Sequence, residues 1–275
     1  FSGQGSLVIQ SGGDRCDVQA DFTGFRGTLH ATGENFRLVP ATSDMPNTTL
    51  VIASGTKVGH YKAQSATALT TQIRKIGALA SSASDAELTN GYYEIGYNNT
   101  DTLFAGKLTA QKVSKYGTGS WTITGTESTS PLYVEEGTLY SKNAKTTGTV
   151  TVDKSAVFAG AISCGNVTLD HAVLRPELSG SVSTGYEYKM FNTSGTITGT
   201  YTVDGNGYVW NDDELLSRGV LKMISTDIHN ISADINVNVY TVSGILLRSN
   251  VAKDKALDNL PAGIYIVNGK NVIKK

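Results

Sequence analysis

Short strands separated by glycine recur along most of this chain. Residues 112–140 hold three segments of alternating apolar residues with glycines between them, and degraded copies of this unit return every 20 or so residues. No helical segment lies between them. Short strands at such a spacing predict a stacked solenoid, in which each turn of the chain covers the apolar side of the next. Glycines that precede Thr-led strands, such as Gly27, Gly55 and Gly137, are expected at tight corners.

The strands are expected where four to eight residues rich in β-branched side chains are bounded by Gly, Asn, Asp or Ser. Residues 63–70 and 80–88 could each carry a helical turn. Pro131 cannot donate a hydrogen bond to a neighbouring strand, so it should stand at a strand start. The predicted strands are residues 6–10, 15–21, 27–31, 36–39, 49–53, 72–79, 92–97, 103–108, 112–114, 119–124, 131–134, 138–141, 149–152, 156–159 and 167–169.

Composition agrees with a folded all-β chain. Of 275 residues, 39% are hydrophobic and 17% charged, and 30 glycines stand against 5 prolines. A net charge of −1 argues against binding to nucleic acid, which requires a clustered excess of Lys and Arg. We therefore interpret Arg74-Lys75, Lys112 and Lys115 as solvated positions. No apolar run is long enough to span a bilayer, so no transmembrane segment is predicted.

The residues that often carry chemistry are scattered. Cys16 and Cys164 should lie several turns apart, so we expect two free, buried thiols. The histidines stand singly, without the spacing of zinc ligands, and are expected at the surface or in turns: His30, His60, His171 and His229. The densest acidic cluster, Asp212-Asp213-Glu214, precedes Leu215-Leu216 and is expected to cap a helical turn. We predict no catalytic residue, no metal site and no cofactor.

Aromatic residues give one binding hypothesis. Tyr92, Tyr93 and Tyr97 cluster in one segment, and in a strand Tyr93 and Tyr97 share a face while Tyr92 points the other way. An exposed aromatic row could stack on the apolar faces of sugar rings. The alternative is that at least one of these tyrosines is an inward residue of the solenoid.

Two stretches point to a family of repeats. Residues 115–125 and 132–139 resemble the autotransporter-associated β-strand repeat of large secreted bacterial surface proteins. Residues 22–29, 76–79 and 104–108 are similar to flanking repeats in surface proteins of the Bacteroidetes. The resemblance implies a right-handed, single-stranded parallel β-helix of the pectin-lyase-like kind, which we expect over residues 1–222.

The C-terminal segment, residues 223–275, differs in pattern. Alternating residues on both sides of Ser243-Gly244 predict a β-hairpin that turns at the glycine. The segment resembles the sorting domain of type IX secretion cargo, a small antiparallel β module. It departs from that family in its short length and in lacking a Pro-Asn-Pro element, so a capping role is an open alternative. The resemblance rests on Val239, Tyr240, Gly244, Leu260, Pro261, Gly263, Tyr265, Gly269, Lys274 and Lys275.

These resemblances imply a non-catalytic protein, secreted or held on the outer surface of a Gram-negative bacterium. It would act as a spacer or adhesin-like stalk, with a polysaccharide or host surface glycan and the secretion machinery as partners. One alternative is the C-terminal ancillary part of a β-helix polysaccharide lyase or glycoside hydrolase, with catalytic turns upstream of Phe1. Another is a secretion scaffold without any ligand.

Overall fold

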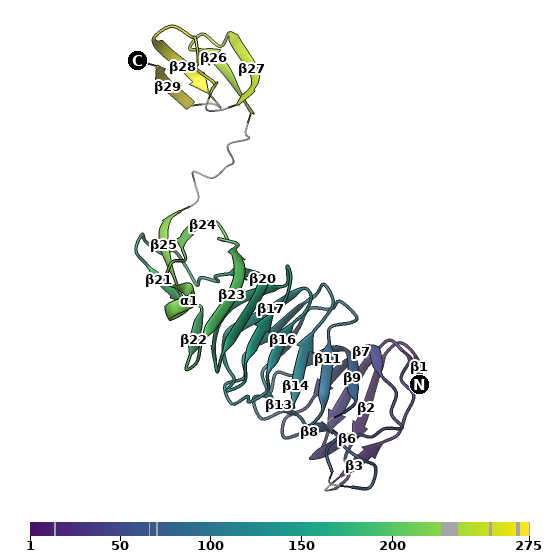
Figure 1. Cartoon of the computed structure of the whole chain (residues 1–275). Coiled ribbons are helices and arrows are strands. Elements are labelled where there is room, and N and C mark those ends of the chain that lie inside the picture. The colour runs from purple at the N-terminus through teal and green to yellow at the C-terminus, as the bar shows by residue number, and fades with distance from the viewer. Residues whose placement is uncertain are drawn as a thin grey trace. The chain divides into compact units, whose positions relative to one another are not determined.

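The chain forms two compact units in the computed structural model, which describes residues 1–13, 15–65, 67–69, 71–226, 236–252, 255–267 and 270–274. One unit comprises Phe1–Asn206 and Trp210–Ile224, and the other comprises Gly207–Val209 and Ser225–Lys275. The larger unit is a parallel β-solenoid of about nine turns (Figure 1). The expected all-β solenoid is therefore confirmed.

The strands of the solenoid stack in parallel on three faces. The first face contains β1 (Ser2–Gly3), β4 (Gly24–Phe25), the first halves of β7 (Met45–Ile52) and β9 (Ile73–Ala80), β11 (Tyr92–Ile95), β14 (Lys112–Lys115), β16 (Leu132–Val134), β18 (Val150–Val152), and the first halves of β20 (Val167–Arg175) and β23 (Ile197–Val203). The second face contains β2 (Ser6–Gln10), β5 (Thr28–Thr32), β12 (Thr102–Phe104), β15 (Ser120–Ile123), the first parts of β17 (Thr138–Lys145) and β19 (Val157–Cys164), and the later halves of the four long strands. The third face contains β3 (Cys16–Val18), β6 (Asn35–Leu38), β8 (Lys57–His60), β10 (Glu87–Thr89) and β13 (Lys107–Thr109). Beyond β13 it continues through Ser128, the last residues of β17 and β19, and β22 (Phe191–Thr193).

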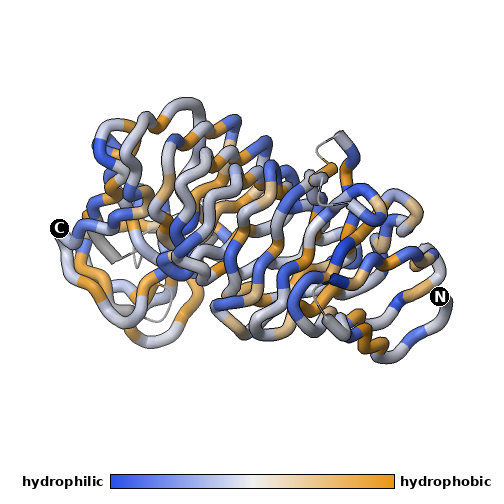
Figure 2. The backbone as a smooth tube through the Cα atoms, turned by 90° about the horizontal axis from the view of Figure 1, so that it is seen from below, coloured by the Kyte–Doolittle hydropathy of each residue, from blue (hydrophilic) through white to orange (hydrophobic). Residues whose placement is uncertain are grey.

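The core is made of ladders, in which an inward residue of one turn stacks on its counterpart in the next. On the first face Val113, Leu132, Val150 and Val167 are in register and all are buried. The second face carries a ladder of larger side chains, Trp121, Leu139, Phe158 and Leu174. Figure 2 shows apolar residues recurring from turn to turn along the backbone. Each turn is covered only by its neighbours. The core therefore runs from turn to turn without a break, but each part of it depends on the adjacent turns alone.

Stacked glycines form the corner between the first and second faces. Gly96, Gly117 and Gly137 have φ values of 118°, 70° and 69°, which favour glycine. A Cβ atom on Gly117 would lie 2.1 Å from the carbonyl oxygen of Gly96, and one on Gly137 would lie 2.2 Å from that of Gly117. The glycines therefore allow successive corners to approach closely, as the sequence predicted for Gly137.

At its C-terminal end the solenoid gives way to antiparallel structure. A three-stranded sheet has the order β21 (Glu187–Lys189), β25 (Val220–Thr226) and β24 (Tyr208–Asn211). The helical turn α1 (Leu215–Arg218) follows Asp212-Asp213-Glu214, as expected, and Leu215 is buried. Glu214 occupies the N-cap position but makes no side-chain capping bond. The helix start is instead closed by the backbone, because the Leu215 amide donates to the Asp212 carbonyl.

The second unit contains an antiparallel sheet of order β27-β26-β28-β29, formed by β26 (Asn236–Thr241), β27 (Leu246–Ala252), β28 (Gly263–Val267) and β29 (Lys270–Lys274). The predicted hairpin is confirmed: β26 pairs with β27 around Gly244, whose φ is 83°. The small core of this unit is Val237, Val239, Ala256, Tyr265 and Val267.

The predicted strand positions are confirmed, whereas the two possible helical turns are not helical and one of the two cysteines is not buried. Each strand predicted from the sequence overlaps an observed strand, and Pro131 directly precedes β16. Residues 63–70 and 80–88 contain no helix in their described positions. Pro46 lies inside β7, where the register with β9 shifts between Met45 and Thr49 and a missing donor is tolerated. Both cysteines are free, but only Cys164 is buried, since Cys16 is partly exposed.

We expect the Phe158→Ala variant to lose about 3–5 kcal/mol of unfolding free energy, because a fully buried ring would leave a cavity. Phe158 packs against Phe191 at a centroid distance of 5.1 Å. Urea unfolding followed by circular dichroism measures the loss. Thr168→Ala, an exposed position on the neighbouring strand β20, is the control and should stay within about 0.5 kcal/mol of the wild type. Equal midpoints for the two variants would contradict the ladder model of the core.

Candidate functional site

Two cations that the sequence placed in solvent lie inside the solenoid. Arg74 is 6% exposed and Lys115 is 2% exposed, so the prediction of solvated positions is wrong for both. Each occupies an inward ladder position: Arg74 pairs with Tyr93, and Lys115 lies between Ile95 and Val134. Their neighbours Lys75 and Lys112 do point outward, with 46% and 35% of the side chain exposed.

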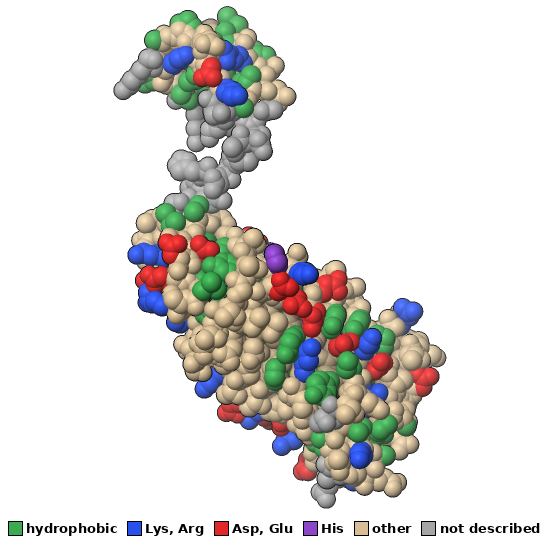
Figure 3. Space-filling model, in the orientation of Figure 1, with side chains coloured by type: hydrophobic (Ala, Val, Ile, Leu, Met, Phe, Trp, Pro, Cys, Tyr) green, Lys and Arg blue, Asp and Glu red, His purple; other side chains and the backbone are tan. Residues whose placement is uncertain are grey.

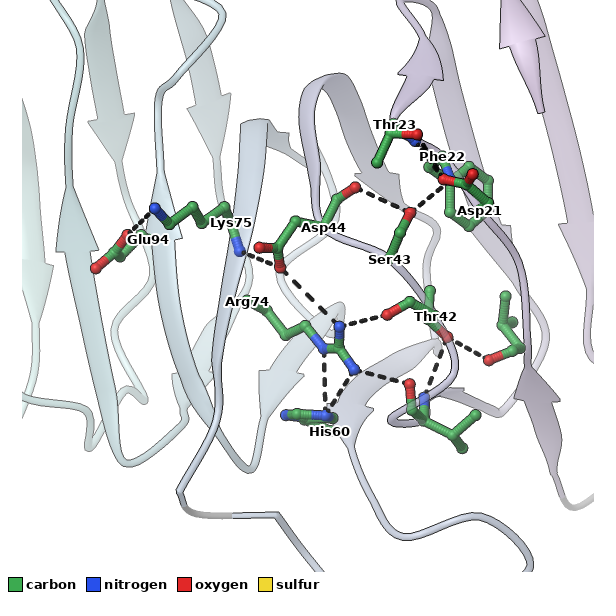
Figure 4. A network of polar contacts seen from close by, with 12 residues as sticks. Asp21, Phe22, Thr23, Thr42, Ser43, Asp44, His60, Arg74, Lys75 and Glu94 are labelled. Carbon is green, nitrogen blue, oxygen red and sulfur yellow. Dashed lines mark hydrogen bonds and ion pairs between the residues drawn. The ribbon is translucent and has the colours of Figure 1, made fainter.

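Arg74 is held by backbone carbonyls and by a histidine (Figure 4). Its Nη2 donates to the Val39 carbonyl at 2.8 Å, and its Nη1 donates to the Thr42 carbonyl. Its Nε lies 3.2 Å from His60 Nε2, and Asp44 is the nearest carboxylate at 4.0 Å. The guanidinium thus ties the 39–44 loop to strand β9 and to the third face.

His60 is fully buried, so its prediction as a surface or turn residue is also wrong. It lies in the same ladder as Leu38 on the third face. Burial and the neighbouring Arg74 guanidinium lower the pKa of His60 to about 4. The imidazole is therefore neutral at pH 7 and accepts a hydrogen bond from Arg74 through Nε2. His30 is partly exposed and His171 exposed, as expected, while His229 lies outside the described residues.

Lys115 fastens the glycine corner from the inside. Its Nζ donates to the carbonyls of Tyr116 at 2.6 Å, Gly117 at 2.7 Å and Glu136 at 3.2 Å. Burial lowers the pKa of this amine to about 8, and the Glu136 charge opposes that shift. These interactions join two successive turns. Arg74 and Lys115 are therefore bound internally and present no charge to a ligand.

The three tyrosines of the glycan hypothesis do not form one row. Tyr93 is 1% exposed and its hydroxyl donates to the Asn90 carbonyl at 2.7 Å, so it is an inward ladder residue. Tyr92 and Tyr97 are partly exposed. Tyr97 does not share a face with Tyr93, because β11 ends at Ile95 and Gly96 turns the corner between them.

The structure instead places Tyr97 in a larger surface, which we call the aromatic surface: Tyr92, Tyr97, Tyr116 and Tyr133 on the first face and its corner. Tyr97 stacks on Tyr116 of the next turn, with ring centroids 5.4 Å apart and planes 11° apart. The Tyr97 hydroxyl lies 2.5 Å from a carboxylate oxygen of Glu94. Figure 3 shows charged and apolar side chains gathered over β11, β14 and β16.

Charges on this surface are paired with one another. Lys75 lies 3.9 Å from Glu94, and Lys112 lies 3.7 Å from Glu135. The Lys112 ammonium also sits 3.8 Å from the centre of the Tyr133 ring. The surface therefore combines aromatic rings with hydrogen-bonding groups, without a strong net charge.

Two carboxyl groups of successive turns meet beside Tyr116. Glu135 follows β16 and Asp153 follows β18, and these strands pair through Val134 and Val152. Burial, hydrogen bonding to Asp153 and the Asp153 charge raise the pKa of Glu135, while Lys112 opposes the shift. The sequence analysis missed this pair, because the two residues are 18 positions apart and only the register of the turns brings them together.

The acidic residues before α1 bond to close neighbours in the sequence. Asp213 bonds to Asn211 and Glu214 pairs with Arg218, so the acidic cluster before α1 is engaged locally. In the described part of the chain, no three His, Cys, Asp or Glu side chains are grouped to hold a metal ion.

The residues of the sorting-like motif have structural roles where they are described. Val239 and Tyr265 are core residues, Gly244 makes the hairpin turn, and the Tyr265 hydroxyl donates to the Pro261 carbonyl at 2.7 Å. Lys274 Nζ donates to the Leu257 carbonyl at 2.6 Å. Tyr240 lies on β26, Leu260 packs against the core and Gly263 begins β28, whereas Gly269 and Lys275 lie outside the described residues.

A scan against protein-family models and a search of curated proteins found no match to this sequence. The resemblances to autotransporter-associated repeats and to a type IX sorting domain therefore stay predictions. Among the described residues, no helix has the length and apolar character needed to cross a membrane.

We expect the His60–Arg74 contact to make stability depend on pH. The folded pKa of His60, about 4, lies below the ordinary value of 6.5, so the unfolded chain binds the proton first. Stability is therefore fully present above pH 6.5 and falls by about 3 kcal/mol as the pH drops to 4. Urea unfolding of wild type and His60→Gln across this range isolates the contribution, since Asp44 and other groups titrate in both proteins. A difference between them that stays constant with pH would contradict the assignment.

Proposed function

We propose that this chain is a non-catalytic, exported surface protein whose solenoid binds polysaccharide along its aromatic surface. The Tyr97–Tyr116 stack carries this proposal, because it places two rings in a fixed orientation at the outer corner of successive turns. Sugar rings present apolar faces that pack on such rings, and hydroxyl groups that need hydrogen-bonding partners. Export, display on a bacterial surface and contact with secretion machinery are proposed from the sequence resemblances alone.

The paired charges favour a neutral polymer. Lys75 with Glu94 and Lys112 with Glu135 largely neutralise each other, so neither an acidic nor a basic ligand gains much from the surface. A parallel sheet stacked turn upon turn is also an extended platform, suited to a chain that contacts several turns at once.

We expect the double variant Tyr97→Ala/Tyr116→Ala, which removes the stack, to lose most of its retardation in affinity gels that contain neutral polysaccharides such as xylan, glucomannan or β-glucan. Both side chains are partly exposed, so their removal should not disturb the core. Thr168→Ala on the same face serves as the matched control. Wild-type protein that no gel retards, or a double variant that is retarded equally, would rule out this surface as the binding site.

A further inference from the structure

A groove on the second face of the solenoid lies apart from the aromatic surface. Its volume is about 600 Å³, within the range of roughly 300–1,000 Å³ usual for ligand sites. One wall is β17, the floor is β19, and the opposite wall is the segment 177–189, which includes β21. Its lining includes Tyr140, Lys142, Ala161, Glu177, Tyr186 and Tyr188.

The backbone explains why the groove is hollow at this point. The pairing of β17 with β19 shifts between Lys142 and Ala144, and Asn143 at the shift has a φ of 54°. Because of this bulge both Lys142 and Asn143 are exposed, which interrupts the usual alternation. The facing residues Gly160 and Ala161 are small and leave the floor open.

Aromatic side chains line the groove at different depths. Tyr188 is 8% exposed and packs edge-on against Trp210, with centroids 6.0 Å apart, so it forms a fixed inner wall. Tyr186 is 42% exposed and stands at the rim. Burial and the Glu177 charge raise the pKa of Tyr140, which keeps its hydroxyl protonated and able to donate.

Among the charged side chains of the groove, one cation and one anion have no ion-pair partner in the described part of the chain. Glu187 lies 3.5 Å from Arg218, and Lys189 Nζ donates to the Arg218 carbonyl. Lys142 lies over the Tyr140 ring at 5.4 Å. Lys142 and Glu177 make no ion pair with any described residue, so the groove has a hydrogen-bonding cation and anion but no net bias toward a charged ligand.

We propose that this groove is a second binding site, which takes a short neutral oligosaccharide. Tyr186 offers a rim on which a sugar ring stacks, and Tyr140, Lys142 and Glu177 hydrogen-bond to its hydroxyls. A peptide added as an extra strand is disfavoured, because β19 is already paired with β17 on one side and with β20 and β22 on the other. The site is separate from the aromatic surface and does not depend on the function proposed for it.

The test uses the full chain titrated calorimetrically with cellohexaose, xylohexaose and mannohexaose, and with oligogalacturonate and an unstructured Lys- and Glu-containing peptide as counter-probes. We expect at least one neutral hexasaccharide to bind. Binding should also change the tryptophan fluorescence emission of the protein. This change should come from Trp210 beside Tyr188, since the second tryptophan, Trp121, is 2% exposed within the core.

Two variants locate the site. Tyr186→Ala removes the exposed rim, and Ala161→Phe fills the groove while keeping every aromatic and polar group. Each should weaken binding of the hexasaccharide about tenfold or more. Tyr97→Ala/Tyr116→Ala and the fold control Thr168→Ala should leave both the affinity and the Trp210 signal unchanged.

The proposal is overturned if no neutral hexasaccharide binds, if oligogalacturonate or the peptide binds as well or better, or if Tyr186→Ala retains wild-type affinity. Loss of hexasaccharide binding in Tyr97→Ala/Tyr116→Ala alone would assign binding to the aromatic surface and remove the groove as a site. If a neutral hexasaccharide binds in the groove but no polysaccharide gel retards the wild-type protein, the groove proposal stands and the aromatic-surface proposal falls. If Ala161→Phe fails to fold, Tyr186→Ala still decides.

Discussion

Stacking of one turn on the next is the constraint on which the rest of this protein depends. A single turn has an apolar inner side that it cannot cover, and a row of backbone donors and acceptors that only another turn satisfies. The ladder from Val113 to Val167 shows the result, since four residues from four turns bury one another. The same stacking requires glycine at corners such as Gly117, where the carbonyl of the previous turn leaves no room for a side chain.

Against that background the two buried cations are exceptions with a common explanation. A charge inside a low-dielectric core is costly unless its hydrogen bonds are satisfied. Arg74 and Lys115 both meet that condition mainly through backbone carbonyls, which lie in loops or corners that strand pairing leaves unsatisfied. Each cation therefore donates hydrogen bonds to carbonyl oxygens at places where neighbouring strands do not pair. The neutral His60 beside Arg74 fits this interpretation, because a second buried positive charge would be unfavourable.

The stacking also generates the surfaces proposed for binding. Residues at matching or adjacent positions of successive turns become neighbours, so Tyr97 meets Tyr116 and Glu135 meets Asp153. Where the pairing is regular, as at Thr151 and Thr168, successive turns stay in register and extend the outer face. Where a bulge and small residues interrupt it, as at Asn143 and Gly160, the surface becomes concave. Regular and irregular stretches of one solenoid thus offer two kinds of surface, one extended and one enclosed.

Alternation of apolar residues and the spacing of glycines by themselves determined the class of fold, most strand positions, the hairpin at Gly244 and the free thiols. The same alternation contained a signal for the buried cations, since Arg74 is in phase with the inward Ile76 and Lys115 with the inward Val113. Only the tertiary structure decided which side chains meet across turns. The turns differ in length, so the register that joins Glu135 to Asp153 or separates Tyr93 from Tyr97 depends on corners and bulges. Such contacts follow from the path of the backbone between strands, which local sequence patterns do not specify.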